Sequence, residues 1–277
     1  MSDRFFLFTR ALWLVLLLTG GSGLLVPASA QVNVSGKPGL IYTPSARVPD
    51  EGTFHIGYTF APRDYAFRFR GRNSESIAYA NLVLLPRFEV NLNLLNPNGP
   101  VPFAAKGIGD RQLDFKYAFL TEKKARPSAA LILSAPFGID NSLVTYALVA
   151  TKNIQLSPSL RLEVTAGTGS PWYIYRDERN DSNNNILEGF TLRRKGSKHI
   201  VPKYLTGPFA GAVLHLRKGT GFMAEWDSQQ FNLGAFATLW KRWTLQAGLL
   251  DGRQLTFGTS YAVSLLSTKP QSAHETR

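Results

Sequence analysis

Alternation of apolar and polar residues with a period of two recurs along most of this chain. In residues 53–60, the apolar side chains of Phe54, Ile56 and Tyr58 alternate with His55 and Gly57. The same alternation is found in residues 87–95, 111–120, 159–168, 243–249 and 255–264. Because successive side chains of a strand point to opposite faces, each segment predicts a β-strand with one apolar face.

Further strands are predicted in the segments between these. They cover residues 65–70, 77–85, 128–137, 143–153, 207–217, 221–229 and 231–240. The total is about twelve strands, within a range of roughly 10–14, and each is close to the roughly 9–11 residues of a tilted membrane-crossing strand. No segment after residue 30 has a helical period, so the sequence predicts an all-β, antiparallel fold.

The connections between the predicted strands fall into two length classes. Residues 85–87, 155–159, 217–221 and 241–242 form tight turns, whereas residues 96–110 and 170–204 are long, polar and rich in Gly, Pro and Asn. Short turns at one end and long loops at the other are typical of a transmembrane β-barrel.

Alternation alone does not tell a membrane barrel from a soluble β-sandwich, because only the direction of the apolar face differs. Aromatic residues at the predicted strand ends favour the barrel, since they would form an interfacial girdle. They are Phe54, Phe60, Phe88, Phe119, Phe137, Trp172, Trp240 and Trp243. Glycines on the polar faces, such as Gly57, Gly234 and Gly248, suit a narrow lumen. A secreted or periplasmic β-sandwich is the alternative.

Residues 1–30 have the three parts of a cleavable export signal. Arg4 and Arg10 form a positive region, an apolar run follows, and Ala28-Ser29-Ala30 is the small-x-small pattern of a cleavage site. An uncleaved anchor helix is disfavoured, because glycines interrupt the run and Pro27 ends it. Cleavage after Ala30 would leave Gln31 as the mature N-terminus.

These boundaries divide the chain into four segments. They are a signal peptide at residues 1–30, a periplasmic lead-in at residues 31–52, a barrel at residues 53–266 and a polar tail at residues 267–277. The formal charge is +12, and the chain contains no cysteine, which excludes disulfides, thiolate metal sites and a lipid-modified N-terminal cysteine.

Several blocks of this sequence resemble the YjbH-type proteins associated with exopolysaccharide and capsule production. The first is Gly39-Leu40-Ile41-Tyr42-Thr43-Pro44-Ser45-Ala46-Arg47, followed by Glu51-Gly52-Thr53-Phe54. The others are Gly107-Ile108-Gly109-Asp110, Phe222-Met223-Ala224-Glu225-Trp226-Asp227, Phe231-Asn232-Leu233-Gly234-Ala235 and Trp243-Thr244-Leu245-Gln246-Ala247-Gly248. The resemblance spans roughly residues 36–265. It implies an outer-membrane β-barrel that acts in surface polysaccharide export or assembly.

The long segment 170–204 is the first candidate binding site. It combines aromatic residues at its base with a later cluster of cations, namely Trp172, Tyr173, Tyr175, Arg193, Arg194, Lys195, Lys198 and Lys203. Aromatic faces stack on sugars, and arginine binds carboxylate or phosphate through two hydrogen bonds. The segment therefore predicts contact with an anionic glycan or, equally, with the phosphates of lipopolysaccharide.

Charged residues on the polar faces of the strands are the second candidate site. They are Arg68, Arg70, Asp114, Lys116, Arg161, Glu163, Glu225 and Asp227. Arg or Lys facing lipid at mid-depth would cost about 2–4 kcal/mol each, so we expect these side chains to point into the barrel. There they would either pair with one another or line a polar path.

Catalysis has little support in the sequence. The four histidines have no metal-ligand spacing and no Gly-x-Ser-x-Gly motif is present, although a pair formed by His215 and a serine on a neighbouring strand stays open. Gly107-x-Gly109 precedes a strand rather than a helix, which is unlike a phosphate-binding loop. We predict no enzyme activity, no cofactor, no metal and no nucleic-acid partner.

The sequence therefore predicts a barrel in the cell outer membrane with a role in exopolysaccharide or capsule biosynthesis or secretion. Its expected partners are outer-membrane lipid and lipopolysaccharide, an anionic polysaccharide and other polysaccharide-export proteins. Two alternatives stay open, a general outer-membrane channel or structural barrel and a soluble periplasmic glycan-binding β-sandwich.

Overall fold

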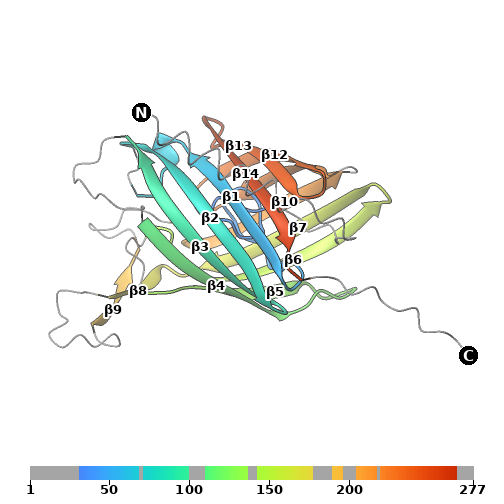
Figure 1. Cartoon of the computed structure of the whole chain (residues 1–277), viewed down its shortest axis with the longest axis horizontal. Helices are drawn as coiled ribbons and strands as arrows, with labels where there is room; N and C mark the ends of the chain where they lie inside the picture. Colours follow the sequence, from blue (N-terminus) through green and yellow to red (C-terminus); the bar gives the residue numbers. More distant parts are fainter. Residues whose placement is uncertain are drawn as a thin grey trace, which may run out of the picture.

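The computed structural model shows a closed β-barrel of tilted strands (Figure 1). It describes residues 31–68, 71–99, 110–136, 142–176, 189–195, 204–216 and 219–266. Twelve antiparallel strands close the barrel in the order β1-β14-β13-β12-β11-β10-β7-β6-β5-β4-β3-β2, and β8 and β9 form a separate two-stranded sheet. A soluble sandwich of two sheets is thereby excluded.

The barrel strands follow the segments of alternating residues. Their bounds are β1 Thr53–Ala61, β2 Ser74–Leu85, β3 Phe88–Asn98, β4 Asp110–Leu120, β5 Ser128–Ser134, β6 Tyr146–Ser157, β7 Leu160–Gly169, β10 Gly207–Leu216, β11 Thr220–Trp226, β12 Phe231–Leu239, β13 Trp243–Leu250 and β14 Gln254–Ser264. The first and last strands pair from Thr53↔Ser264 to Phe60↔Phe257, which closes the cylinder and leaves no open edge.

One predicted strand is wrong. Residues 65–70 were expected to be extended, but a 3-10 helix, η1, spans Arg63–Tyr65 and bends follow it. The backbone N–H groups of Phe67 and Arg68 donate to the Glu75 carboxylate, at 2.5 and 2.8 Å. A side chain thus takes the hydrogen bonds that a strand partner would otherwise take, and the chain curls over the barrel end.

The two ends of the barrel differ in their connections, as the loop lengths predicted. At the turn end, short links join β2 to β3, β6 to β7, β10 to β11 and β12 to β13. At the loop end, long links join β3 to β4 and β7 to β10, and the hairpin β8 (Trp172–Arg176) and β9 (Phe190–Arg194) belongs to the second of these. The sequence did not predict this hairpin.

Apolar side chains cover the outside of the barrel and polar ones face its interior. On β1, Ile56 is 53% exposed while His55 is fully buried, and on β14 Phe257 is 53% exposed while Thr256 is buried. A soluble protein would have the opposite arrangement. An apolar outer face on a closed barrel is the signature of strands that cross a membrane. No helix of the described residues is long and apolar enough to span a membrane.

The N-terminal segment lies inside the barrel, which corrects the expected periplasmic lead-in at residues 31–52. Residues 31–46 are all buried. They contact Glu225 of β11, Thr151 of β6 and Asn91 of β3, and β11 and β3 lie on opposite sides of the wall. We call residues 31–47 the plug segment. Residues 47–49 are partly exposed and residues 50–51 are exposed, and the chain is buried again at Gly52 and Thr53, where β1 begins.

Some predictions concern residues outside the described part of the chain. These are the signal peptide with Ala28 and Ala30, Arg70, Phe137, Lys198, Lys203 and the polar tail at residues 267–277.

Candidate functional site

The interior of the barrel is the most elaborate polar site of the described residues, and the plug segment occupies it. Glu225 of β11 anchors one turn of this segment. Its oxygens accept hydrogen bonds from the backbone N–H groups of Ile41 (3.1 Å), Tyr42 (2.7 Å) and Thr43 (3.1 Å) and from the Thr43 hydroxyl (2.9 Å). Asn232 of β12 donates to the same carboxylate at 3.1 Å. Glu225 therefore satisfies the three backbone N–H groups of residues 41–43.

A second anchor joins Lys37 of the plug segment to Asp114 of β4. The ammonium and the carboxylate form an ion pair, and each side chain is 1% exposed. Asp114 also accepts hydrogen bonds from the Ser134 hydroxyl at 2.5 Å and the Asn93 amide at 3.2 Å. A buried ion pair requires such additional partners, because desolvation otherwise outweighs the attraction.

A third anchor lies at Arg47, where the plug segment approaches β7. One guanidinium nitrogen lies 3.3 Å from Glu163, and the other donates to the backbone and side-chain oxygens of Gln31 at 3.2 and 3.0 Å. The Arg47 carbonyl accepts a hydrogen bond from Lys116 at 2.7 Å. Nε2 of His215 also lies 3.3 Å from Glu163. Arg47 thus ties the first plug residue and the segment's exit to the same part of the wall.

Glycines on the wall leave the space that the plug segment fills. A Cβ added to Gly211 of β10 would lie 2.5 Å from Leu40, and one added to Gly234 of β12 would lie 2.8 Å from Ile41. Gly248 of β13 faces Ile41 as well. Contacts shorter than 3.0 Å cannot be accommodated without movement. Gly211, Gly234 and Gly248 therefore leave room for individual plug side chains, whereas Gly57 leaves room for Tyr79 of the wall.

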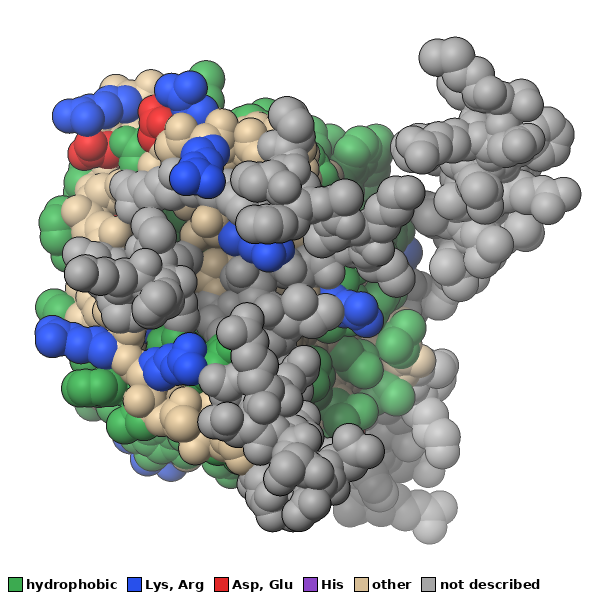
Figure 2. Space-filling model, turned by 90° about the vertical axis from the view of Figure 1, so that its left-hand side faces the viewer, with side chains coloured by type: hydrophobic (Ala, Val, Ile, Leu, Met, Phe, Trp, Pro, Cys, Tyr) green, Lys and Arg blue, Asp and Glu red, His purple; other side chains and the backbone are tan. Residues whose placement is uncertain are grey.

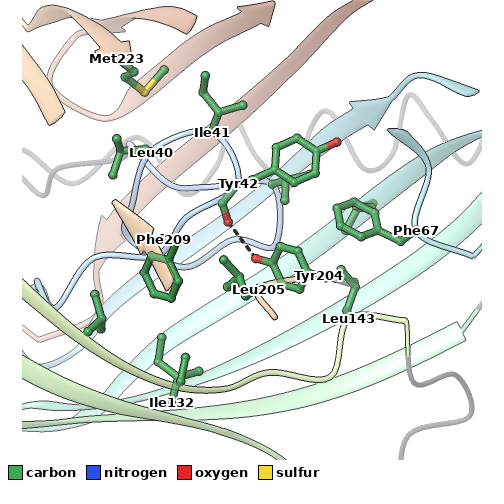
Figure 3. Close-up of a cluster of buried hydrophobic side chains, with 14 of the residues drawn as sticks. Leu40, Ile41, Tyr42, Phe67, Ile132, Leu143, Tyr204, Leu205, Phe209 and Met223 are labelled. Atoms are coloured by element: carbon green, nitrogen blue, oxygen red, sulfur yellow. Dashed lines mark hydrogen bonds between the residues drawn. The ribbon is translucent and has the colours of Figure 1, made fainter. Parts of the chain in front are cut away.

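Tyr42, Phe67 and Tyr204 lie together in a buried aromatic cluster (Figure 3). Tyr42 of the plug stacks on Phe67, with ring centroids 5.4 Å apart, and Phe67 meets Tyr204 edge-on at 5.2 Å. The Tyr204 hydroxyl donates to the Tyr42 carbonyl at 2.9 Å. Burial raises the pKa of the Tyr204 hydroxyl well above its ordinary value, so it stays a donor. The cluster links the plug segment to two loop-end connections.

The β8–β9 hairpin carries most of the described residues of the first candidate site, and it has two different faces. Trp172, Ile174, Phe190 and Leu192 are exposed, and the pairing Ile174↔Leu192 places them on one face. On the other face, the Arg193 guanidinium lies 3.7 Å from the centroid of the Tyr175 ring. Figure 2 looks onto the loop end, where Lys and Arg side chains are more prominent than Asp and Glu.

Two residues predicted to meet a ligand on this hairpin are instead buried. Tyr173 is 1% exposed and Lys195 is 7% exposed. The Lys195 ammonium donates to the Tyr204 carbonyl at 3.0 Å. Burial lowers the pKa of Lys195 to about 8, and the negative charge of Asp114 opposes this shift. Among the described cations of this segment, Arg193 is partly exposed and Arg194 is exposed, so these two are accessible at the surface.

Most of the charges predicted to face the lumen are buried there. Asp114, Lys116, Glu163 and Glu225 are each 1% exposed, and Asp227 is buried in the turn after β11. Arg161 is half-buried on β7, and Arg68 lies in the connection between β1 and β2. The sequence reasoning missed Glu75 and Glu89, which also face inward, and the two plug cations, Lys37 and Arg47. Glu89 could have been found, since it lies on the polar face of its predicted strand.

The site binds a polypeptide segment of the same chain. The side chain beside His215 is a carboxylate, Glu163, and the ring also packs against Phe236 at 5.7 Å. In the described part of the chain, no group of three His, Cys, Asp or Glu side chains is placed to hold a metal ion. The Lys116 ammonium lies 3.0 Å from Glu89, which is a structural ion pair.

Comparison with protein families gives one match over nearly the whole chain. The family model YjbH, described as exopolysaccharide biosynthesis protein YbjH, matches residues 31–277. The comparison with curated proteins finds no match.

Solved structures similar to this chain include two porins. One is the KdgM porin, with 9% sequence identity and a TM-score of 0.43, covering 76% of this chain and 99% of the porin. The other is the NanC porin in a rhombohedral crystal form, with 10% identity and a TM-score of 0.40, covering 77% and 99% of the two chains.

Proposed function

Because this chain belongs to the YjbH family of exopolysaccharide biosynthesis proteins, we propose that it is an outer-membrane β-barrel acting in exopolysaccharide or capsule biosynthesis or secretion. The observation that carries this proposal is the extent of the family match. It covers the closed barrel and the plug segment together, so the family relation concerns the whole architecture described above. A non-enzymatic role is part of this proposal, and the plug segment that occupies the interior supports it.

The apolar outer face supports a position in the outer membrane. Side chains such as Leu148 (49% exposed), Phe222 (58%) and Leu255 (67%) lie on the outside of the barrel, where only lipid would match them. Cleavage after Ala30 would release a mature chain that begins at Gln31, a buried residue inside the barrel. Mass spectrometry of the purified protein should give this N-terminus. Carbonate extraction of membranes should leave the protein in the pellet, and release into the wash would contradict the proposal.

The β8–β9 hairpin supports two contacts at the cell surface, one on each face. Tyr175 and Arg193, with their short cation–π distance, present an aromatic ring and a guanidinium to an anionic polysaccharide. The exposed apolar face around Leu192 suits the outer leaflet, and the neighbouring Arg194 can pair with lipopolysaccharide phosphates. Other polysaccharide-export proteins are the further expected partners.

A deletion strain tests the proposed function. We expect loss of the gene to reduce the surface or secreted polymer, and the wild-type gene to restore it. A double variant, Arg193→Gln with Arg194→Gln, should restore less polymer at equal protein abundance.

The matched control is Arg253→Gln, which alters an exposed loop-end arginine that pairs with Asp251. This variant should restore polymer fully. Unchanged polymer in the deletion strain would reject the proposed function. Full restoration by the hairpin variant would reject only the glycan contact.

A general open channel is the less suitable function, because a buried peptide segment crosses the lumen. An open porin would need a water-filled path through its centre.

A further inference from the structure

The inward-facing charges of the barrel strands are predominantly acidic. Among the described side chains, five carboxylates of the strands face the lumen, against one lysine and one arginine. The carboxylates are Glu75, Glu89, Asp114, Glu163 and Glu225, and the cations are Lys116 and Arg161. His55 and His215 also face inward from β1 and β10. The wall alone therefore has an excess of negative charge.

The plug segment neutralises part of this excess. It contributes Lys37 to Asp114 and Arg47 to Glu163, and its backbone N–H groups supply three donors to Glu225. None of these groups belongs to the wall. If the segment left the lumen, the three carboxylates would lose these partners, and water and mobile cations would take their place.

The plug segment is held by contacts of a kind that can be reversed. No cysteine is available to link it to the wall, and its C-terminal end leads through residues 48–52 into β1 at Thr53. Many of its contacts are buried ion pairs and hydrogen bonds. The desolvation of buried charges offsets much of their attraction, so the net stabilisation is small compared with the number of contacts.

We propose that residues 31–47 are a removable plug, and that the barrel without them is a cation-selective conduit. This goes beyond the role in exopolysaccharide production. A wall with excess carboxylates raises the local concentration of cations and excludes anions. The emptied lumen would therefore admit small cations or neutral solutes, and an anionic polymer would meet the protein at the basic loop end instead of passing through it.

Planar-bilayer recording of two proteins tests the proposal, namely the mature chain of residues 31–277 and a variant that lacks residues 31–47. The mature chain should be closed for most of the time. The shortened barrel should conduct steadily, and its reversal potential in a KCl gradient should show potassium permeating severalfold better than chloride. Adding Glu163→Gln and Glu225→Gln to the shortened barrel should bring this ratio closer to one.

A second variant covers the case in which the shortened barrel does not fold. The full mature chain with Lys37→Met and Glu225→Gln removes two anchors, and it should show openings that the wild type lacks. Silence of every folded variant, or a preference for chloride, would overturn the proposal. The bilayer recording tests only the conduit, and the polymer assay of the deletion strain tests only the role in exopolysaccharide production. A negative result in one assay therefore does not decide the other.

Discussion

Single side chains of the wall hold the plug segment, and Glu225 makes the largest number of contacts with it. Glu225→Gln would replace one acceptor oxygen with an NH2 group that faces backbone donors. Hydrogen bonds to a charged group contribute about 1.5–3 kcal/mol, so we expect the exposed population of the plug to rise at least about tenfold.

Labelling of a cysteine placed at the buried Ser45 with a membrane-impermeant maleimide measures this rise. The chain has no other cysteine to label. Glu51→Gln, at an exposed acid outside the lumen, is the matched control and should leave labelling at the wild-type rate. Equal labelling in both variants would show that Glu225 does not anchor the plug.

Gly36 tests whether the plug fits the wall sterically. Its φ is +81°, and an added Cβ would lie 2.4 Å from the Tyr79 ring. Gly252 also has a positive φ, of +66°, but an added Cβ there meets nothing within 4 Å. Both Ala variants therefore carry the backbone strain of about 1 kcal/mol, and only Gly36→Ala adds a collision. Gly36→Ala should raise Ser45→Cys labelling clearly more than Gly252→Ala does, and similar labelling in the two would contradict the described fit.

Lys195 predicts a specific dependence of stability on pH. The folded state has a pKa of about 8 for this ammonium, and the ordinary value is 10.5. Below pH 8 the group is charged in both states. Between pH 8 and pH 10.5 the unfolded state binds more protons, so the contribution of Lys195 to the free energy of unfolding rises with pH.

Urea unfolding of the wild type and of Lys195→Met at pH 7 and pH 10 measures this contribution. The wild type should gain on the order of 2–3 kcal/mol relative to the variant, at about 1.4 kcal/mol for each pKa unit. An identical pH dependence of the two proteins would show that Lys195 is not buried in this way.

At the scale of elements, the sequence predicts the strands well because their signal is local. Residues 53–60, 111–120 and 159–168 were expected as strands, and the structure has them as β1, β4 and β7 with shifts of one residue at their ends. The prediction at residues 65–70 was wrong because Glu75, several residues away, takes the backbone N–H groups. The β8–β9 hairpin gave no clear signal, because its strands of five residues carry aromatic residues and arginines on both faces.

The β8–β9 hairpin is an addition to the barrel rather than a part of it. Strands β7 and β10 pair directly from Gly169↔Gly207 to Leu160↔Leu216, so the wall does not depend on the hairpin. Replacing residues 172–194 with a short Gly/Ser linker should therefore leave the heat-modifiable gel shift of a folded barrel intact. Loss of the gel shift would show that the hairpin is needed for closure. Lipid binding and polymer restoration should both decrease in this variant.

At the scale of the whole molecule, the sequence predicted the barrel and the inward direction of its charged side chains. It did not predict which groups those side chains bind. Asp114, Glu163 and Glu225 were expected to pair with one another or to line a path. Their partners are Lys37, Arg47 and the backbone of residues 41–43, and Glu225 lies 184 residues from Ile41 along the chain. No local pattern encodes such a contact. The plug segment itself has neither strand nor helix periodicity, so the sequence reasoning placed it outside the barrel.

One measurement tests the central claim, that this chain forms a membrane barrel filled by its own N-terminal segment. The Ala46 N–H donates to the Thr151 hydroxyl at 2.8 Å, which joins the plug to β6. In the cysteine-free background, the pair Ala46→Cys and Thr151→Cys should form a disulfide in protein taken from the outer-membrane fraction. The control pair Glu51→Cys and Thr151→Cys should stay reduced. Free thiols in the first pair that react with a water-soluble maleimide as quickly as an exposed cysteine would contradict the account.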